Sequence, residues 1–219
     1  MKIVSKVLSW LFLPLLTPVY AILIAMYVEN MEAPYYSGES LFFLNDRVKE
    51  FYLYVFTSFS FLAPALTVLF LQTRGSVSSV MMEKRTERII PSIMVVLFGV
   101  SLLAILLFKV PEDIPGRRFI LGLSLGSLIA VVVCTILTFR WKVSLHAAGM
   151  GILTGFLYMY YSQMLLFPMW LLVLAFIASG IVMAARMYLN LHSLAQLIAG
   201  FTIGFASLIV GIKFFLVYY

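Results

Sequence analysis

Three side chains near the end of the chain have the types and spacing to act on an anionic group. Arg186, His192 and Gln196 stand six and four positions apart in the segment 185–204, ARMYLNLHSLAQLIAGFTIG. A histidine can attack phosphorus or transfer a proton near neutral pH, and a guanidinium can hold phosphate oxygens. A residue four positions further along a helix lies on the same face, so Gln196 can hold the ring of His192.

The only other histidine of the chain has similar neighbours. His146 follows Arg140, Lys142 and Ser144 in the segment 140–149, RWKVSLHAAG. If the two turns meet, one unprotonated imidazole can attack phosphorus while the other, protonated, gives its proton to the leaving oxygen. Guanidinium and ammonium groups would hold the remaining phosphate oxygens. The combination predicts phosphate chemistry that needs no metal ion and no cofactor.

The elements that position these residues must lie in a membrane. Of 219 residues, 63% are hydrophobic and only 11% are charged, and the mean hydropathy is +1.09, which exceeds what one soluble core can bury. Crossing a bilayer takes roughly 20 apolar residues as a helix, and the apolar runs do not alternate as barrel strands would. We therefore expect an all-α fold, a polytopic transmembrane helix bundle of six to seven spans that forms a single integral membrane domain over residues 1–219.

Charged and Pro/Gly clusters divide the chain into candidate spans. They are residues 7–28, 51–72, 89–108, 119–139, 143–161, 165–187 and 197–218. The first follows Lys2 and Lys6 and is too long for the apolar part of a cleavable signal peptide, so we expect it to be retained as a helix. The single cysteine, Cys134, has no partner for a disulfide or a cysteine metal site, and we interpret it as a packing residue.

Alternation of seven spans places the amino terminus, the 73–88 loop, the 140–146 turn and the 186–196 turn on one face of the membrane. The basic residues of that face are Lys2, Lys6, Arg74, Lys84, Arg85, Arg88, Arg140, Lys142 and Arg186, and its acidic residues are Glu83 and Glu87. The positive-inside rule predicts that this face is cytoplasmic in a cell (inner) membrane. A site for an anionic substrate would gather the same residues, so both explanations of the charge remain open.

In their order and spacing, these motifs resemble the type 2 phosphatidic acid phosphatase family, the membrane lipid phosphatases. The run Arg186-x5-His192-x3-Gln196 is similar to the family's third signature, Ser-Arg-x5-His-x3-Asp. SLHAAG, residues 144–149, is similar to the second signature, Pro-Ser-Gly-His. MEKRTERIIP, residues 82–91, stands where the first signature, Lys-x6-Arg-Pro, is expected.

The resemblance covers about residues 80–204 and implies a phosphatase-like core over about 80–219, whereas the first two spans are not diagnostic. It implies that His192 is the nucleophile and becomes phosphorylated, that Gln196 supports it, and that His146 protonates the leaving alcohol and later activates water. The residues implied to bind phosphate are Arg186, Ser144, Lys84 and Arg88. The implied partner is a lipid phosphate substrate within the membrane, and no nucleic acid is expected.

Several positions depart from the family pattern. Val143 stands in place of Pro, Leu145 in place of Gly and Ala185 in place of Ser, and the first signature does not align because position 81 is Met. Gln196 replaces the carboxylate of the third signature, and in serine proteases a similar acid-to-amide change costs about 10⁴ in rate. Two alternatives therefore stay open: a member that binds lipid phosphate with little or no turnover, and a non-enzymatic transporter or scaffold, which would place polar groups near the bilayer midplane.

Overall fold

Helices form most of the computed structural model, which describes residues 2–32, 39–78 and 86–218. The helical elements are α1 (Lys2–Leu11), α2 (Thr17–Tyr27), α3 (Asp46–Phe56), the π-helical turn η1 (Thr57–Leu62), α4 (Ala63–Thr73), the short η2 (Thr86–Arg88), α5 (Ile89–Lys109), α6 (Arg117–Thr138), α7 (Leu145–Tyr161), α8 (Met169–Tyr188) and α9 (Leu194–Tyr218). Two short strands, β1 (Met31–Glu32) and β2 (Met164–Leu166), pair antiparallel. The prediction of an all-α fold is confirmed.

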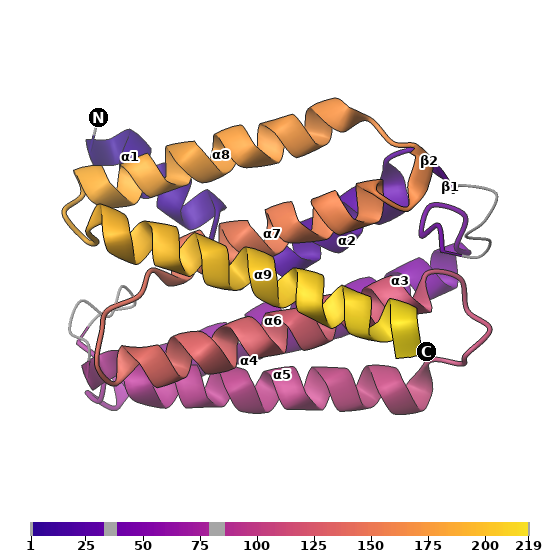
Figure 1. Cartoon of the computed structure of the whole chain (residues 1–219). Helices are drawn as coiled ribbons and strands as arrows, with labels where there is room; N and C mark the ends of the chain where they lie inside the picture. The colour runs from indigo at the N-terminus through magenta and orange to yellow at the C-terminus, as the bar shows by residue number, and fades with distance from the viewer. Residues whose placement is uncertain (1, 33–38, 79–85, 219) are drawn as a thin grey trace.

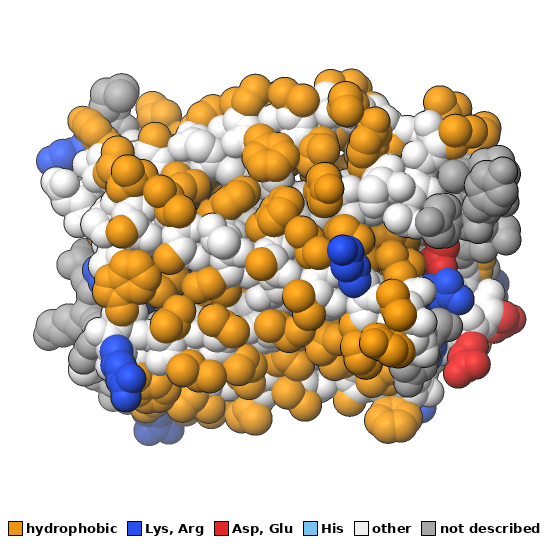
Figure 2. Space-filling model, in the orientation of Figure 1, with side chains coloured by type: hydrophobic (Ala, Val, Ile, Leu, Met, Phe, Trp, Pro, Cys, Tyr) orange, Lys and Arg blue, Asp and Glu red, His pale blue; other side chains and the backbone are white. Residues whose placement is uncertain are grey.

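Five segments of the described residues are long and apolar enough to cross a membrane. They are Asp46–Thr73, Thr86–Lys109, Arg117–Thr138, Met169–Tyr188 and Leu194–Tyr218. Figure 2 shows hydrophobic side chains over the face between the two ends of the bundle, with most of the charged side chains near those ends. The chain is thus a multi-pass helical membrane protein, as its composition predicts.

The predicted first span, 7–28, is not one continuous helix. α1 ends at Leu11 and α2 begins at Thr17, with Pro14 between them. Proline has no N–H and disfavours the helical conformation in the residue before it, which explains the break. Because of the break, α1 packs against α8 while α2 packs against α7 (Figure 1).

The segment Asp46–Thr73 also departs from a regular helix, at the π-helical turn η1. Pro64 follows directly at the start of α4. In a regular helix its ring would clash with the carbonyl of Ser60, and it has no N–H to donate to that carbonyl. The wider π turn accommodates this proline, and the Ser60 hydroxyl donates to the carbonyl oxygen of Phe56 at 2.6 Å. Such turns occur often at functional sites, and this one borders the cavity described below.

Close packing of α9 against α7 and α6 forms the core of the bundle. A Cβ atom at Gly204 would overlap the carbonyl oxygen of Ala148, and one at Gly151 would overlap the backbone of α9. On the other side of α9, a Cβ at Gly126 would stand 2.8 Å from Cα of Leu208. Glycine is the residue that permits such an approach between helix backbones. These glycines therefore allow α9 to pack closely against α7 and α6.

The two ends of the bundle have different contents. The start of α1, the end of α4, the start of α5 and the α6–α7 and α8–α9 turns share one end (Figure 1). The opposite end contains β1, β2, the starts of α3, α6 and α8, and the end of α9. This is the arrangement that alternating spans predict, and it brings the turns that carry the two histidines to the same end.

Candidate functional site

His192 lies in the turn between α8 and α9, next to the first turn of α9. Asn190 adopts the left-handed conformation (φ 55°) where the chain leaves α8. Ser193 and Gln196 cap α9 reciprocally, because the Gln196 N–H donates to Ser193 Oγ (3.4 Å) and the Ser193 N–H donates to Gln196 Oε1 (3.1 Å). The same Oε1 atom lies 3.3 Å from Nδ1 of His192.

These contacts define which ring nitrogen of His192 carries the proton. The backbone N–H of Ser193 can only donate, so the amide atom that faces it is the oxygen of Gln196. That oxygen can only accept, so Nδ1 of His192 carries the hydrogen and Nε2 keeps its lone pair. A neutral imidazole with a free Nε2 lone pair is the form that attacks phosphorus.

His146 stands in the first turn of α7, and a residue of α1 contacts its ring. Its Nε2 donates to the backbone carbonyl of Ser9 in α1 at 3.1 Å. Ser144 is the N-cap of α7, where its Oγ accepts from the N–H of Ala147 at 3.4 Å. The N–H of Ser144 in turn donates to the carbonyl of Gln196 at 3.3 Å. The starts of α7 and α9 are therefore joined, which fixes the two histidines relative to each other.

Two buried arginines complete this end of the bundle. Arg186 lies in the last turn of α8, and its side chain is only 3% exposed. Its Nε and Nη1 are buried and have no hydrogen-bond partner among the described residues. Arg88 is the N-cap of α5 and is also buried. An unmatched buried guanidinium is costly, so the arrangement favours the binding of an anion beside Arg186.

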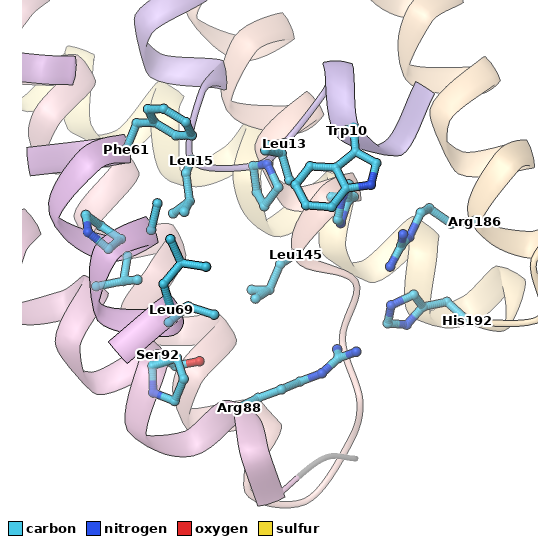
Figure 3. A pocket seen from close by; sticks show the side chains of 17 residues that line it. Trp10, Leu13, Leu15, Phe61, Leu69, Arg88, Ser92, Leu145, Arg186 and His192 are labelled. Carbon is cyan, nitrogen blue, oxygen red and sulfur yellow. The ribbon is translucent and has the colours of Figure 1, made fainter. Parts of the chain in front are cut away.

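One cavity of about 270 Å³ brings these groups together. Arg88, His146, Arg186 and His192 all line it, and Figure 3 shows Arg88, Arg186 and His192 converging at one side. Apart from Ser92, the rest of the wall is apolar, and it comes mainly from the α1–α2 region, η1, α4 and α5. None of its lining residues in the described part of the chain is acidic, and no three His, Cys, Asp or Glu side chains of that part are grouped as metal ligands. A cationic cavity end without carboxylates is suited to an anion.

The electrostatic setting keeps His192 neutral at pH 7. Burial, together with the nearby charges of Arg88, Arg186 and Lys142, lowers the pKa of His192 to about 4, and the hydrogen bond that the ring donates to Gln196 raises it by less. The ring is therefore unprotonated well below neutral pH, and its Nε2 lone pair is available.

The structure places most of the predicted site residues together. His146, His192, Arg186 and Arg88 share the cavity, and Gln196 holds His192. Ser144 does not line the cavity and is fully buried as the N-cap of α7, so its predicted contact with phosphate stays a prediction. Lys84 lies outside the described residues.

The sequence interpretation missed the residues that shape the cavity. Trp10, Leu13 and Leu15 come from the first predicted span, and Phe61 and Leu69 come from the second. The carbonyl of Ser9 that holds His146 also belongs to this region. Pro14 and Pro64, which interrupt these two helices, were the available signal, because prolines inside apolar spans mark places where the backbone departs from a regular helix.

Comparison with protein-family models, with curated proteins and with solved structures found no match to this chain. The local geometry of the cavity and the three short motifs are thus the basis for any functional conclusion.

Proposed function

We propose that the protein is a membrane lipid phosphatase that hydrolyses a lipid phosphomonoester or diphosphate through a phosphohistidine on His192. The observation that supports this most is the convergence of two histidines and two buried arginines on one cavity without acidic lining residues in the described chain. The unpartnered Nε and Nη1 of Arg186 are buried donors that can each bind an oxygen of an anion. The apolar remainder of the cavity fits a lipid.

In the first step, Nε2 of His192 attacks phosphorus and the bond from phosphorus to the lipid oxygen breaks. Arg186 and Arg88 hold the other phosphate oxygens and stabilise the charge that develops on them. The leaving oxygen takes a proton from His146. The negative charge of the bound phosphate offsets the nearby guanidinium groups and favours the protonated form of His146 that this step needs.

In the second step, His146, now neutral, removes a proton from water, and the resulting oxygen attacks the phosphorus of the phosphohistidine. The bond from phosphorus to Nε2 breaks, and inorganic phosphate leaves. The neutral amide of Gln196 keeps the proton on Nδ1 throughout, so that Nε2 is regenerated as the nucleophile. For a diphosphate substrate the leaving group is the lipid monophosphate.

Phosphate release from a panel of lipid phosphates tests the proposal. We expect His192→Ala to be slower than the wild type by about 10³-fold or more, because the nucleophile is lost. Thr73→Ala is the matched control, since Thr73 is exposed at the same end of the bundle but does not line the cavity. Equal rates for the wild type and His192→Ala would remove the catalytic assignment.

A second candidate function is the binding of lipid phosphate without turnover. Gln196 favours it, because an amide holds the ring of His192 but provides no negative charge to stabilise an imidazolium. In that case the purified protein binds a lipid phosphate, the binding is weakened by Arg186→Ala, and no inorganic phosphate appears over the whole panel. A transporter is less well supported, because the charged residues of the cavity lie at one end of the bundle.

We further propose six to seven membrane crossings in a cell (inner) membrane, with the cavity on the cytoplasmic side. α7 has 17 residues, a rise of about 25 Å at 1.5 Å per residue, and α1 with α2 forms a broken first crossing. In a Cys134→Ala background, Ser193→Cys and Glu112→Cys probe opposite ends of the bundle. We expect an impermeant reagent to label only the Glu112→Cys variant in intact cells. Labelling of the Ser193→Cys variant would contradict the placement of the cavity on the cytoplasmic side.

A further inference from the structure

A second, smaller cavity adjoins the cavity of the candidate phosphate site. It has a volume of about 60 Å³ and is lined mainly by α2, η1, α5 and α6. Three residues, Pro14, Leu15 and Val95, line both cavities. The two cavities therefore adjoin at these three residues.

One face of α5 runs along both cavities. The residues that it contributes are Arg88, at the N-cap of α5, Pro91, Ser92 and Val95 in the first cavity, and Val95, Gly99 and Leu102 in the second. Their spacing of three to four positions forms a single stripe on a helix. From Arg88 to Leu102 this stripe extends by about 21 Å at 1.5 Å per residue. A ligand held by its phosphate at Arg88 thus has a path of that length away from the charged end.

The walls of this path are suited to a hydrocarbon chain. Phe59 and Ser60 of the π turn line the second cavity, while Phe61 lines the first. On α6, Ser124 and Ser127 are polar residues in this lining, and their hydroxyls are buried without a hydrogen-bond partner among the described residues. The second cavity has less than a quarter of the volume of the first, 60 against 270 Å³, which leaves room for one chain.

Two residues that line the first cavity, Trp10 of α1 and Leu69 of α4, are also half-exposed on the surface of the bundle. α1 packs against α8 and α4 packs against α5, with little contact between α1 and α4. Trp10 and Leu69 lie on the two walls of the first cavity that these helices provide (Figure 3). A lipid can therefore reach the arginines sideways, with its chain already in an apolar environment.

We propose that the substrate is a lipid phosphate with a single hydrocarbon chain, and that this chain runs past Val95 into the second cavity. This inference rests on the proposed function, because the reaction of the substrate is taken from it. The location of the hydrocarbon chain does not depend on that reaction. Moving a chain from lipid into an apolar cavity gives little hydrophobic gain, since both surroundings are apolar. The chain therefore acts mainly by aligning the phosphate with Nε2 of His192, and its effect is larger on rate than on affinity.

Filling the second cavity tests this placement. Ser127→Leu adds an apolar branch to the cavity lining, and Ser127→Ala is the matched control that leaves the space open. With hexadecyl phosphate, we expect kcat/KM to fall by about tenfold in Ser127→Leu and to be unchanged in Ser127→Ala. With hexyl phosphate, which is too short to reach the second cavity, both variants should match the wild type. Gly99→Val, which fills the same cavity from α5, should repeat the result if Ser127→Leu does not fold.

Two outcomes would overturn the proposal: an equal loss for hexyl and hexadecyl phosphate in Ser127→Leu, or faster wild-type hydrolysis of a two-chain phosphatidate than of hexadecyl phosphate. If no substrate is hydrolysed, the proposed function fails separately, and crosslinking by a hexadecyl phosphonate with a photoreactive group at the end of its chain then tests the chain site. Crosslinks to the residues that line the second cavity, lost in Ser127→Leu, support the inference, whereas crosslinks confined to other residues refute it.

Discussion

Two halves of the bundle differ in how tightly they are packed. α6, α7 and α9 approach one another through glycines, and α7 is buried along most of its length. The half made of α1 and the bent helix from α3 to α4 is interrupted by prolines and exposes apolar residues such as Leu66 and Phe70. Both halves contribute to the cavity, but they contribute different things.

The tightly packed half carries the two histidines of the proposed mechanism, and the looser half provides much of the apolar wall. His146 and His192 stand at the starts of helices that are joined by the bond from the Ser144 N–H to the Gln196 carbonyl. Trp10 and Phe61 come from the looser half. Geometry within a fraction of an ångström matters for proton transfer and nucleophilic attack, whereas a wall that admits a lipid needs freedom to move. In the proposed mechanism, chemistry and lipid access are therefore divided between the two halves.

The largest effect is expected where the tight half is broken. A Cβ at Gly204 would overlap the carbonyl oxygen of Ala148, so Gly204→Ala must separate α9 from α7. We expect a loss of stability of about 3 kcal/mol or more, visible as a lower melting temperature and reduced folded yield. Gly180→Ala in α8 is the control, since nothing lies within 4 Å of its Cβ position. It should be neutral or slightly stabilising, and a similar loss in both variants would refute the packing difference.

At Arg186 the expected effect on stability is smaller, and it is opposite in sign to the expected effect on activity. Its guanidinium is buried next to Arg88, and Nε and Nη1 have no partner among the described residues. The substitution Arg186→Met puts an apolar side chain there and removes an uncompensated charge. We expect the melting temperature without ligand to rise, while kcat/KM for lipid phosphate falls by about 10² to 10³-fold. Arg140→Met, at an exposed position of the same end, should change neither. A lower melting temperature in Arg186→Met would show that Arg186 is a structural residue.

The sequence predicted the positions of the charged site residues better than it predicted the structure of the looser half. Alternating spans were enough to place His146, His192 and Arg186 at one end, because each stands beside a helix terminus that hydropathy locates. The side-chain partner of His192 also followed from the spacing of helical residues, since Gln196 is four positions away.

The cavity wall was not predictable in the same way. In a membrane protein, the apolar residues that face lipid and those that face a cavity have the same composition, so Leu13 and Leu69 carry no signal of their own. The division of the first span at Pro14 also depends on tertiary packing, because α1 and α2 contact different partners. The capping role of Ser144 was missed because Ser is suited equally to an N-cap and to a phosphate contact.

The smallest and most specific effect is expected from Gln196→Glu, which changes the charge beside His192 while keeping its shape. A carboxylate beside Nδ1 favours the imidazolium and raises the pKa of His192 from about 4 by roughly 1 to 3 units. Because the nucleophile must be unprotonated, activity falls as pH falls through this pKa, so the acid limb of kcat/KM moves to higher pH in Gln196→Glu. Gln196→Met, which accepts no comparable hydrogen bond, should lower kcat/KM at every pH without moving the limb toward higher pH. An acid limb that stays in place in Gln196→Glu would mean that the protonation of His192 does not govern the reaction, and would leave the tightly packed half with a structural role alone.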